Sequence, residues 1–170
     1  VYKRQVLCGQ LEGHPYRDVF STVYSDDEEG GHFAALAMKD RGRKDIVAVL
    51  GPQDNPAVVD RLRGYRAVLG EDLPDANVIY TGWNSGDGYQ AMHQILAREI
   101  AFDGVLCGSD RIAAGVITAL NEAGLSVPAD VSVVGFDDHE IAARCVPALT
   151  TVRQPLREEG HMAANIALDM

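Results

Sequence analysis

The sequence predicts an α/β fold built on one doubly wound parallel sheet, and three observations indicate it. Short runs rich in β-branched residues alternate along the chain with longer stretches of helical periodicity. The first of those runs is almost continuously apolar, as a strand covered on both faces must be. The chain has 170 residues, of which 46% are apolar and 24% charged, and this suits a globular domain with its own core.

Four runs are expected to form the strands of the sheet. They are residues 45–51, 76–80, 102–108 and 131–136. Because a helical stretch separates each run from the next, right-handed crossovers would place the strands parallel in a single sheet.

Helices are expected over residues 31–40, 57–69, 86–98 and 110–123, with a last one over 155–170. The clearest is 110–123, because its apolar residues recur at helical spacing: Ile112, Ala113, Val116, Ile117 and Leu120. Either Ser109 or Asp110 can cap its free N–H groups. Gly124 suits the left-handed conformation that often follows the end of a helix.

The charge of the chain limits its direct partners. It has 15 Lys and Arg against 25 Asp and Glu, so its net charge is -10, which repels a nucleic acid backbone. No apolar stretch is long enough to predict a membrane partner. Three cysteines without a CxxC pair are typical of a reducing compartment, and the cytoplasm is therefore the expected location.

Polar segments follow all four predicted strands, at residues 51–54, 81–84, 107–110 and 135–138. In a doubly wound sheet, ligands bind beyond the carboxyl ends of the strands. These segments would meet at that edge, and one of them contains the single tryptophan, Trp83. The sequence therefore predicts a ligand site there.

Motifs for cofactors, metals and catalysis are missing or better explained by structure. The chain has no GxGxxG, no GxxxxGK[ST] and no HExxH, so no cofactor and no metal are expected. The spacing around Ser85 differs from GxSxG, and Ser85 is expected to cap a helix. Asp137 and Asp138 are adjacent, and such side chains normally point apart. Cys107 is expected to be a buried strand residue, and the chain is not expected to be an enzyme.

Four motifs together carry a resemblance to a known family. They are RLRGY at 61–65, GSDRIAAG at 108–115, VPADVSVVGFDD at 127–138 and PALTTVRQP at 147–155. In this order and spacing, over roughly residues 20–168, the chain resembles the effector-binding domain of the LacI/GalR family of bacterial transcription regulators. The resemblance implies a periplasmic-binding-protein-like fold, in which two α/β subdomains hold a ligand cleft and a helix-turn-helix DNA-binding domain precedes them.

The resemblance also implies how the chain is organised. Residues 1–5, a polar and basic segment without an initiator Met, are expected to be non-native, whereas the resemblance implies that 6–22 are a remnant of the N-terminal subdomain. Residues 23–154 would form the C-terminal, effector-binding subdomain, and 155–170 a helix returning to the N-terminal one. The helix-turn-helix is expected to be absent from this chain.

Seven residues are carried over as effector contacts. Arg61 would reach the effector, Trp83 would stack on it as an aromatic does in sugar-binding members, and Asp137 would accept hydrogen bonds from it. Ser109 stands where many members have Asn, so a direct contact is less well supported and Asp110 is expected to cap the helix. The remaining contacts are Gln154, Ser25 and Asp26.

The expected function is effector sensing, with a sugar as the expected effector, in a regulator that binds operator DNA as a homodimer through the missing domain. An alternative is a periplasmic sugar-binding protein of a transport system, which shares the fold. An upstream helix-turn-helix would favour the first function and an upstream signal peptide the second.

Overall fold

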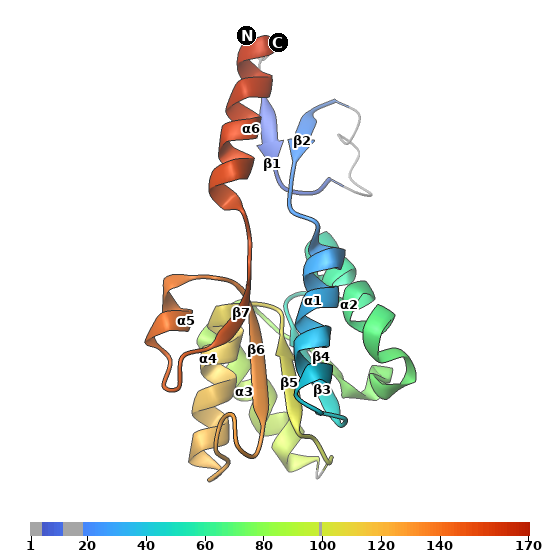
Figure 1. The fold of residues 1–170 in the computed structure, drawn as a ribbon, viewed down its shortest axis with the longest axis vertical. Helices are drawn as coiled ribbons and strands as arrows, with labels where there is room; N and C mark the ends of the chain where they lie inside the picture. The colour runs from blue at the N-terminus through green and yellow to red at the C-terminus, as the bar shows by residue number, and fades with distance from the viewer. Residues whose placement is uncertain (1–4, 12–18, 99) are drawn as a thin grey trace. The chain divides into compact units, whose positions relative to one another are not determined.

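The computed structural model describes residues 5–11, 19–98 and 100–170. The described chain forms two compact units (Figure 1). Unit 1 comprises the described residues up to Asp26 together with Gln154–Met170, and unit 2 comprises Asp27–Arg153. Unit 2 carries four of the seven predicted contact residues.

Unit 2 is built on a five-stranded parallel sheet of order β4-β3-β5-β6-β7. The strands are β3 (Ile46–Leu50), β4 (Val78–Tyr80), β5 (Gly104–Cys107), β6 (Ser132–Asp137) and β7 (Thr150–Arg153). The four predicted strands and their parallel direction are confirmed. The edge strand β7 was not predicted, because its sequence TTVR is short and none of its residues is fully buried.

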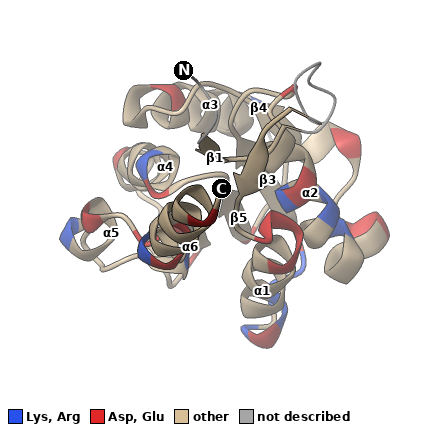
Figure 2. Cartoon of the chain, turned by 90° about the horizontal axis from the view of Figure 1, so that it is seen from above, with Lys and Arg blue, Asp and Glu red and all other residues tan. Residues whose placement is uncertain are grey.

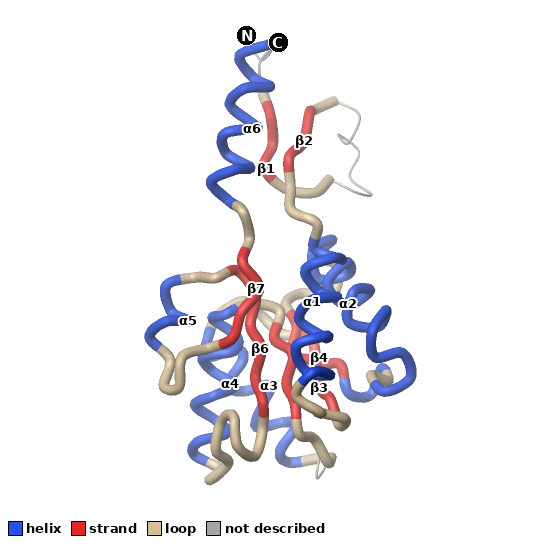
Figure 3. The backbone as a smooth tube through the Cα atoms, in the orientation of Figure 1, coloured by secondary structure: helices blue, strands red, loops and turns tan. Residues whose placement is uncertain are grey.

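Helices cover both faces of this sheet, which confirms the doubly wound fold (Figures 2 and 3). The helices of unit 2 are α1 (Asp27–Asp40), α2 (Pro56–Leu69), α3 (Ser85–Ala97), α4 (Asp110–Glu122) and α5 (Glu140–Arg144), with short 3-10 turns at Gly70–Asp72 and Asp75–Asn77. Figure 2 shows charged residues on the helices, whereas β3, β4 and β5 have none.

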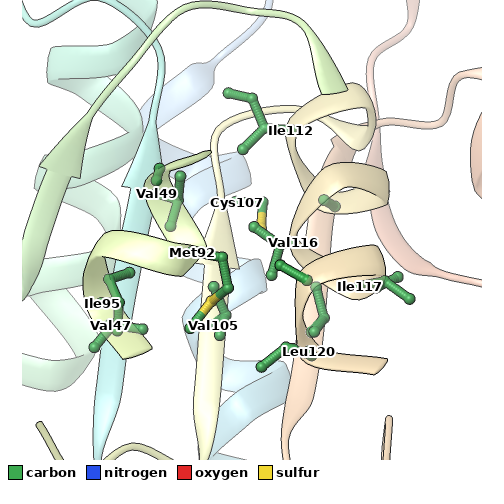
Figure 4. Packing of buried hydrophobic residues seen from close by; sticks show 14 of the residues in the cluster. Val47, Val49, Met92, Ile95, Val105, Cys107, Ile112, Val116, Ile117 and Leu120 are labelled. Carbon is green, nitrogen blue, oxygen red and sulfur yellow. The ribbon is translucent and has the colours of Figure 1, made fainter. Parts of the chain in front are cut away.

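The central strand β3 shows why the sheet needs both layers. All five of its residues are fully buried. Val47 and Val49 belong to the apolar cluster that includes α3 and α4, and Figure 4 shows them near Met92 of α3 and Val116 of α4. The alternate β3 residues pack with α1 and α2 on the other face. The nearly continuous apolar run is therefore explained by burial on both sides.

Paired glycines bring the helices of each layer into backbone contact. A Cβ placed on Gly31 of α1 would collide with the carbonyl of Arg61 in α2, and one on Gly64 of α2 would collide with the carbonyl of Glu28 in α1. Gly88 and Gly115 make the same reciprocal contact between α3 and α4. Only a residue without a side chain allows the helix axes to approach this closely.

Helix ends follow the capping rules with two corrections. Gly124 has a φ of 78°, as predicted for the residue after α4. Asn84, not Ser85, caps α3, and it shares a capping box with Asp87. Helix α1 begins at Asp27, before the predicted residue 31, because acidic residues in its first turn stabilise the N-terminus.

Unit 1 contains a small parallel sheet of β1 (Val6–Cys8) and β2 (Ser21–Val23), on which helix α6 (Leu156–Asp169) packs. This helix confirms the one predicted over 155–170. Most of the segment at residues 1–5 lies outside the described residues. In the part of the chain that is described, no helix is long and apolar enough to cross a membrane.

Candidate functional site

Arg61 lies on α2 and points into the carboxyl edge of the sheet of unit 2. Its side chain is 4% exposed, which excludes the surface position usual for a mid-helix arginine. Nε donates a hydrogen bond to Oδ1 of Asp27 at 2.7 Å, and Nη1 donates to the carbonyl of Gly108 at 2.5 Å. The guanidinium carbon lies 3.7 Å from the centroid of the Phe136 ring. These contacts fix the guanidinium in one orientation.

Local structure explains why an arginine is held here. Asn55 caps α2 directly after β3, because its side chain accepts from the backbone N–H of Ala57. The close contact at Gly31 and Gly64 then brings the first turn of α1 against α2. Asp27, in that first turn, meets Arg61 as a result.

Asp137 ends β6 next to Arg61, with its Oδ1 3.7 Å from Nη1 of the arginine. Its side chain is 33% exposed, so it can meet both the guanidinium and a ligand. Asp137 has a φ of 113° and Asp138 a φ of 55°, conformations that cost about 1–3 kcal/mol each for a residue with a side chain. Such strain is concentrated at functional sites.

The pKa of Asp137 is raised to about 6, first because burial disfavours the carboxylate. The positive charge of Arg61 opposes this change, whereas the negative charges of Asp110 and Asp27 add to it. At pH 7 the side chain is mainly ionised, and it is then a hydrogen-bond acceptor only.

Trp83 follows β4 and is half-buried, with packing contacts to both apolar clusters of unit 2. The residue beneath its ring is Gly51, at the end of β3: a Cβ placed there would lie 2.5 Å from the indole. The ring is therefore seated over the end of the central strand, and part of it remains exposed.

Ser109 is buried and caps α4, because its hydroxyl accepts from the N–H of Ile112 at 3.3 Å. The prediction that Asp110 caps this helix is wrong. Asp110 is its first residue, and its carboxylate accepts from Thr151 at 2.5 Å and from the N–H of His139 at 2.7 Å. Burial raises its pKa. Asp110 thus fixes the loop after Asp137 in place.

The structure brings Arg61 and Asp137 together and places Trp83 and Ser109 in the same unit. Ser25, Asp26 and Gln154 belong to unit 1, where the hydroxyl of Ser25 donates to Glu159 of α6. Their part in a ligand site stays a prediction.

Sequence reasoning missed the residues that hold Arg61. Asp27 was outside the predicted helix, which began at residue 31. Phe136 was placed at the end of a predicted strand, without a contact to Arg61. Cys107 is fully buried, and burial raises its pKa, so this thiol is a core residue as expected. Among the described residues, no cluster of three or more His, Cys, Asp or Glu could hold a metal ion.

Comparison with known families identifies the fold. The family described as "Periplasmic binding protein-like domain" matches residues 35–170. The chain belongs to this family. The resemblance to LacI-type regulators is likewise confirmed by individual relatives.

Three relatives illustrate the similarity. The HTH-type transcriptional repressor PurR of Salmonella arizonae is 37% identical over 160 residues, which are 92% of this chain and 47% of that protein. The transcriptional regulator CelR in complex with cellobiose has a TM-score of 0.90 and 34% identity, covering 96% of this chain and 51% of that one. A dimeric Lac repressor has a TM-score of 0.85 and 26% identity, covering 96% and 59%. The chain spans about half the length of the curated relatives it matches.

Proposed function

We propose that this chain is the effector-sensing part of a LacI-type transcription regulator, and that its effector is a sugar or a similar polyhydroxylated molecule. The observation that carries the proposal is the buried arginine at the carboxyl edge of the sheet, held 3.7 Å from the carboxylate of Asp137. A charge pair whose arginine is buried, next to a strained backbone, lowers the folding free energy that the chain gains. Such costs are concentrated at functional sites, which supports a binding role for this pair.

The chemistry of the site suits hydroxyl groups. Each hydroxyl both donates and accepts, so it can accept from Arg61 and donate to Asp137. Two of the five N–H donors of Arg61 are used by Asp27 and Gly108, and the planar guanidinium aims others from the same fixed position. The exposed part of Trp83 offers a flat apolar surface for the C–H face of a sugar ring.

The partners of the whole protein are part of the proposal. Operator DNA would be bound by a helix-turn-helix domain outside this chain, because the net charge of -10 repels a phosphate backbone. A homodimer is proposed, since operators bound by such domains are two-fold symmetric and the similar Lac repressor, which carries a C-terminal deletion and one substitution, is dimeric. Such a regulator would act in the cytoplasm. No reaction is proposed, because the relatives are transcriptional repressors.

The alternative, a sugar-binding protein of a transport system, is not favoured. The relatives and solved structures that support the family are regulators, among them PurR and CelR.

The test is calorimetric titration of the full-length protein with a panel of neutral sugars, cellobiose and ribose among them. For the sugar that binds, Arg61→Ala and Asp137→Ala should each weaken binding by about 1.5–3 kcal/mol, the range for hydrogen bonds to charged groups. Arg63→Ala is the matched control, because Arg63 lies on the same helix and is 54% exposed. Equal binding by the folded Arg61, Asp137 and Arg63 variants would mean that the effector is bound elsewhere.

A further inference from the structure

The charge of Arg61 is already balanced before any ligand arrives. The side chains of Arg61 and Asp27 are 4% and 7% exposed, and their 2.7 Å hydrogen bond is therefore shielded from solvent. The first turn of α1 supports the carboxylate of Asp27, because free N–H groups at a helix N-terminus favour a negative charge. A buried ion pair of this kind leaves little net positive field for an anion.

Two further carboxylates lie at the same edge of the sheet. Asp137 is 3.7 Å from the guanidinium, and Asp110 is fully buried beside the β6 end. Burial raises the pKa of both residues, and the negative charge of Asp110 adds to the rise at Asp137. Asp137, with a pKa of about 6, is still mainly ionised at pH 7, and the cationic Arg111 that faces it is exposed. The two carboxylates within 4 Å of the guanidinium, Asp27 and Asp137, therefore outnumber the one buried cation.

We propose that Asp27 determines the charge specificity of the site: by neutralising Arg61 it makes the site reject phosphorylated and carboxylated ligands and accept uncharged polyhydroxylated ones. Arg61 is then a directional hydrogen-bond donor and not an anion-binding residue. The proposal rests on the proposed function, because it assumes that the effector meets Arg61. It adds that an arginine in the effector position does not imply an acidic effector.

Asp27→Asn is the direct test, because it removes the balancing charge and keeps the size of the side chain. The full-length protein is titrated with inorganic phosphate at constant ionic strength, so that screening is equal in all samples. The parent protein should show no saturable binding. The variant should gain phosphate affinity by roughly tenfold to a hundredfold, the worth of one charge-assisted hydrogen bond.

Three control variants separate charge from structure. Asp27→Glu keeps the charge and should keep the rejection of phosphate. Asp60→Asn removes the same charge from a pair whose arginine is exposed, in which Arg63 donates to Asp60 at 2.7 Å, and should gain nothing. Adding Arg61→Met to Asp27→Asn should abolish the gain. A gain that survives Arg61→Met, or no gain in folded Asp27→Asn, overturns the proposal.

The parent protein provides a second test that does not depend on the folding of any variant. The protein is titrated separately with glucose, galactose and ribose and with the phosphate of each sugar, while the fluorescence of Trp83 is followed. Binding of a neutral sugar without its phosphate supports both proposals. Binding of a sugar phosphate, or of inorganic phosphate, overturns the charge specificity but leaves the sensing function intact. Failure of every small molecule to bind counts against the sensing function, and the phosphate titration of Asp27→Asn still decides the role of Asp27.

Discussion

Replacing Gly64 by alanine should loosen the contact between α1 and α2 and thereby the support of Arg61. The new Cβ would lie 2.6 Å from the backbone nitrogen of His32 and closer still to the carbonyl of Glu28. These are backbone atoms within a helix, so no side-chain rotation relieves the overlap. The helices must separate, and in a close-packed interior that separation is unfavourable.

The size of the effect follows from two opposing terms. Overpacking against backbone should cost about 3 kcal/mol, the upper part of its usual range. Alanine in place of glycine within a helix returns about 1 kcal/mol. The net loss of folding free energy is then about 2 kcal/mol. The control, Gly86→Ala, adds a Cβ in the first turn of α3 with nothing within 4 Å, and it should stabilise by about 0.4–1 kcal/mol.

Urea unfolding followed by circular dichroism measures both variants in the full-length protein. The two variants should differ by about 3 kcal/mol, which separates their midpoints by about 1–3 M urea. The loosened Gly64→Ala protein should also bind the effector more weakly, because Asp27 and Arg61 lie on the helices that separate. Equal midpoints for the two variants would refute the argument that glycine is required at this contact.

Two further predictions concern Asp137 and Ser109. The pKa of Asp137, raised from 3.8 to about 6, means that the folded protein binds a proton more tightly than the unfolded one. The stability of the parent protein relative to Asp137→Asn should therefore fall as the pH rises from about 4 to about 6. Thermal melts of both proteins across that pH range would measure the difference in stability. A difference that stays constant with pH would contradict the raised pKa of Asp137. Ser109→Ala removes the cap of α4 and should cost about 1 kcal/mol in urea unfolding, whereas Thr118→Ala on the exposed side of α4 should cost less than half of that; equal losses would contradict the capping role.

The parts of the fold that the sequence predicted are those that local pattern determines. The strand β3 was predicted because burial on both faces requires an apolar composition. The helix α4 was predicted because burial of one face requires apolar residues at helical spacing. Strand β7 and the short helix α5 were missed, since an exposed edge strand and a five-residue helix carry neither signal. The cap of α3 was misplaced by one residue, because Asn84 and Ser85 are both good capping residues.

The candidate site was predictable only in part, for a different reason. Arg61 was predicted through a family motif alone, whereas Asp137 also lies in a polar segment that follows a predicted strand. The partner of Arg61 was not found, because Asp27 is 34 residues away along the chain and meets it only after two helices pack. Hydrogen bonds between distant residues depend on tertiary packing, and a single sequence contains no direct record of them.

The reciprocal glycine contacts have a mechanical consequence. Sliding of α1 along α2, or of α3 along α4, would move a Cβ to a point where only a hydrogen atom fits. Each of the two helix pairs therefore resists sliding of one helix along the other. The chain enters unit 2 at Asp27 and leaves it at Arg153. Asp27, which accepts the hydrogen bond from Arg61, is thus also the first residue of the unit. A displacement of the segment before Asp27 would therefore act directly on the support of Arg61.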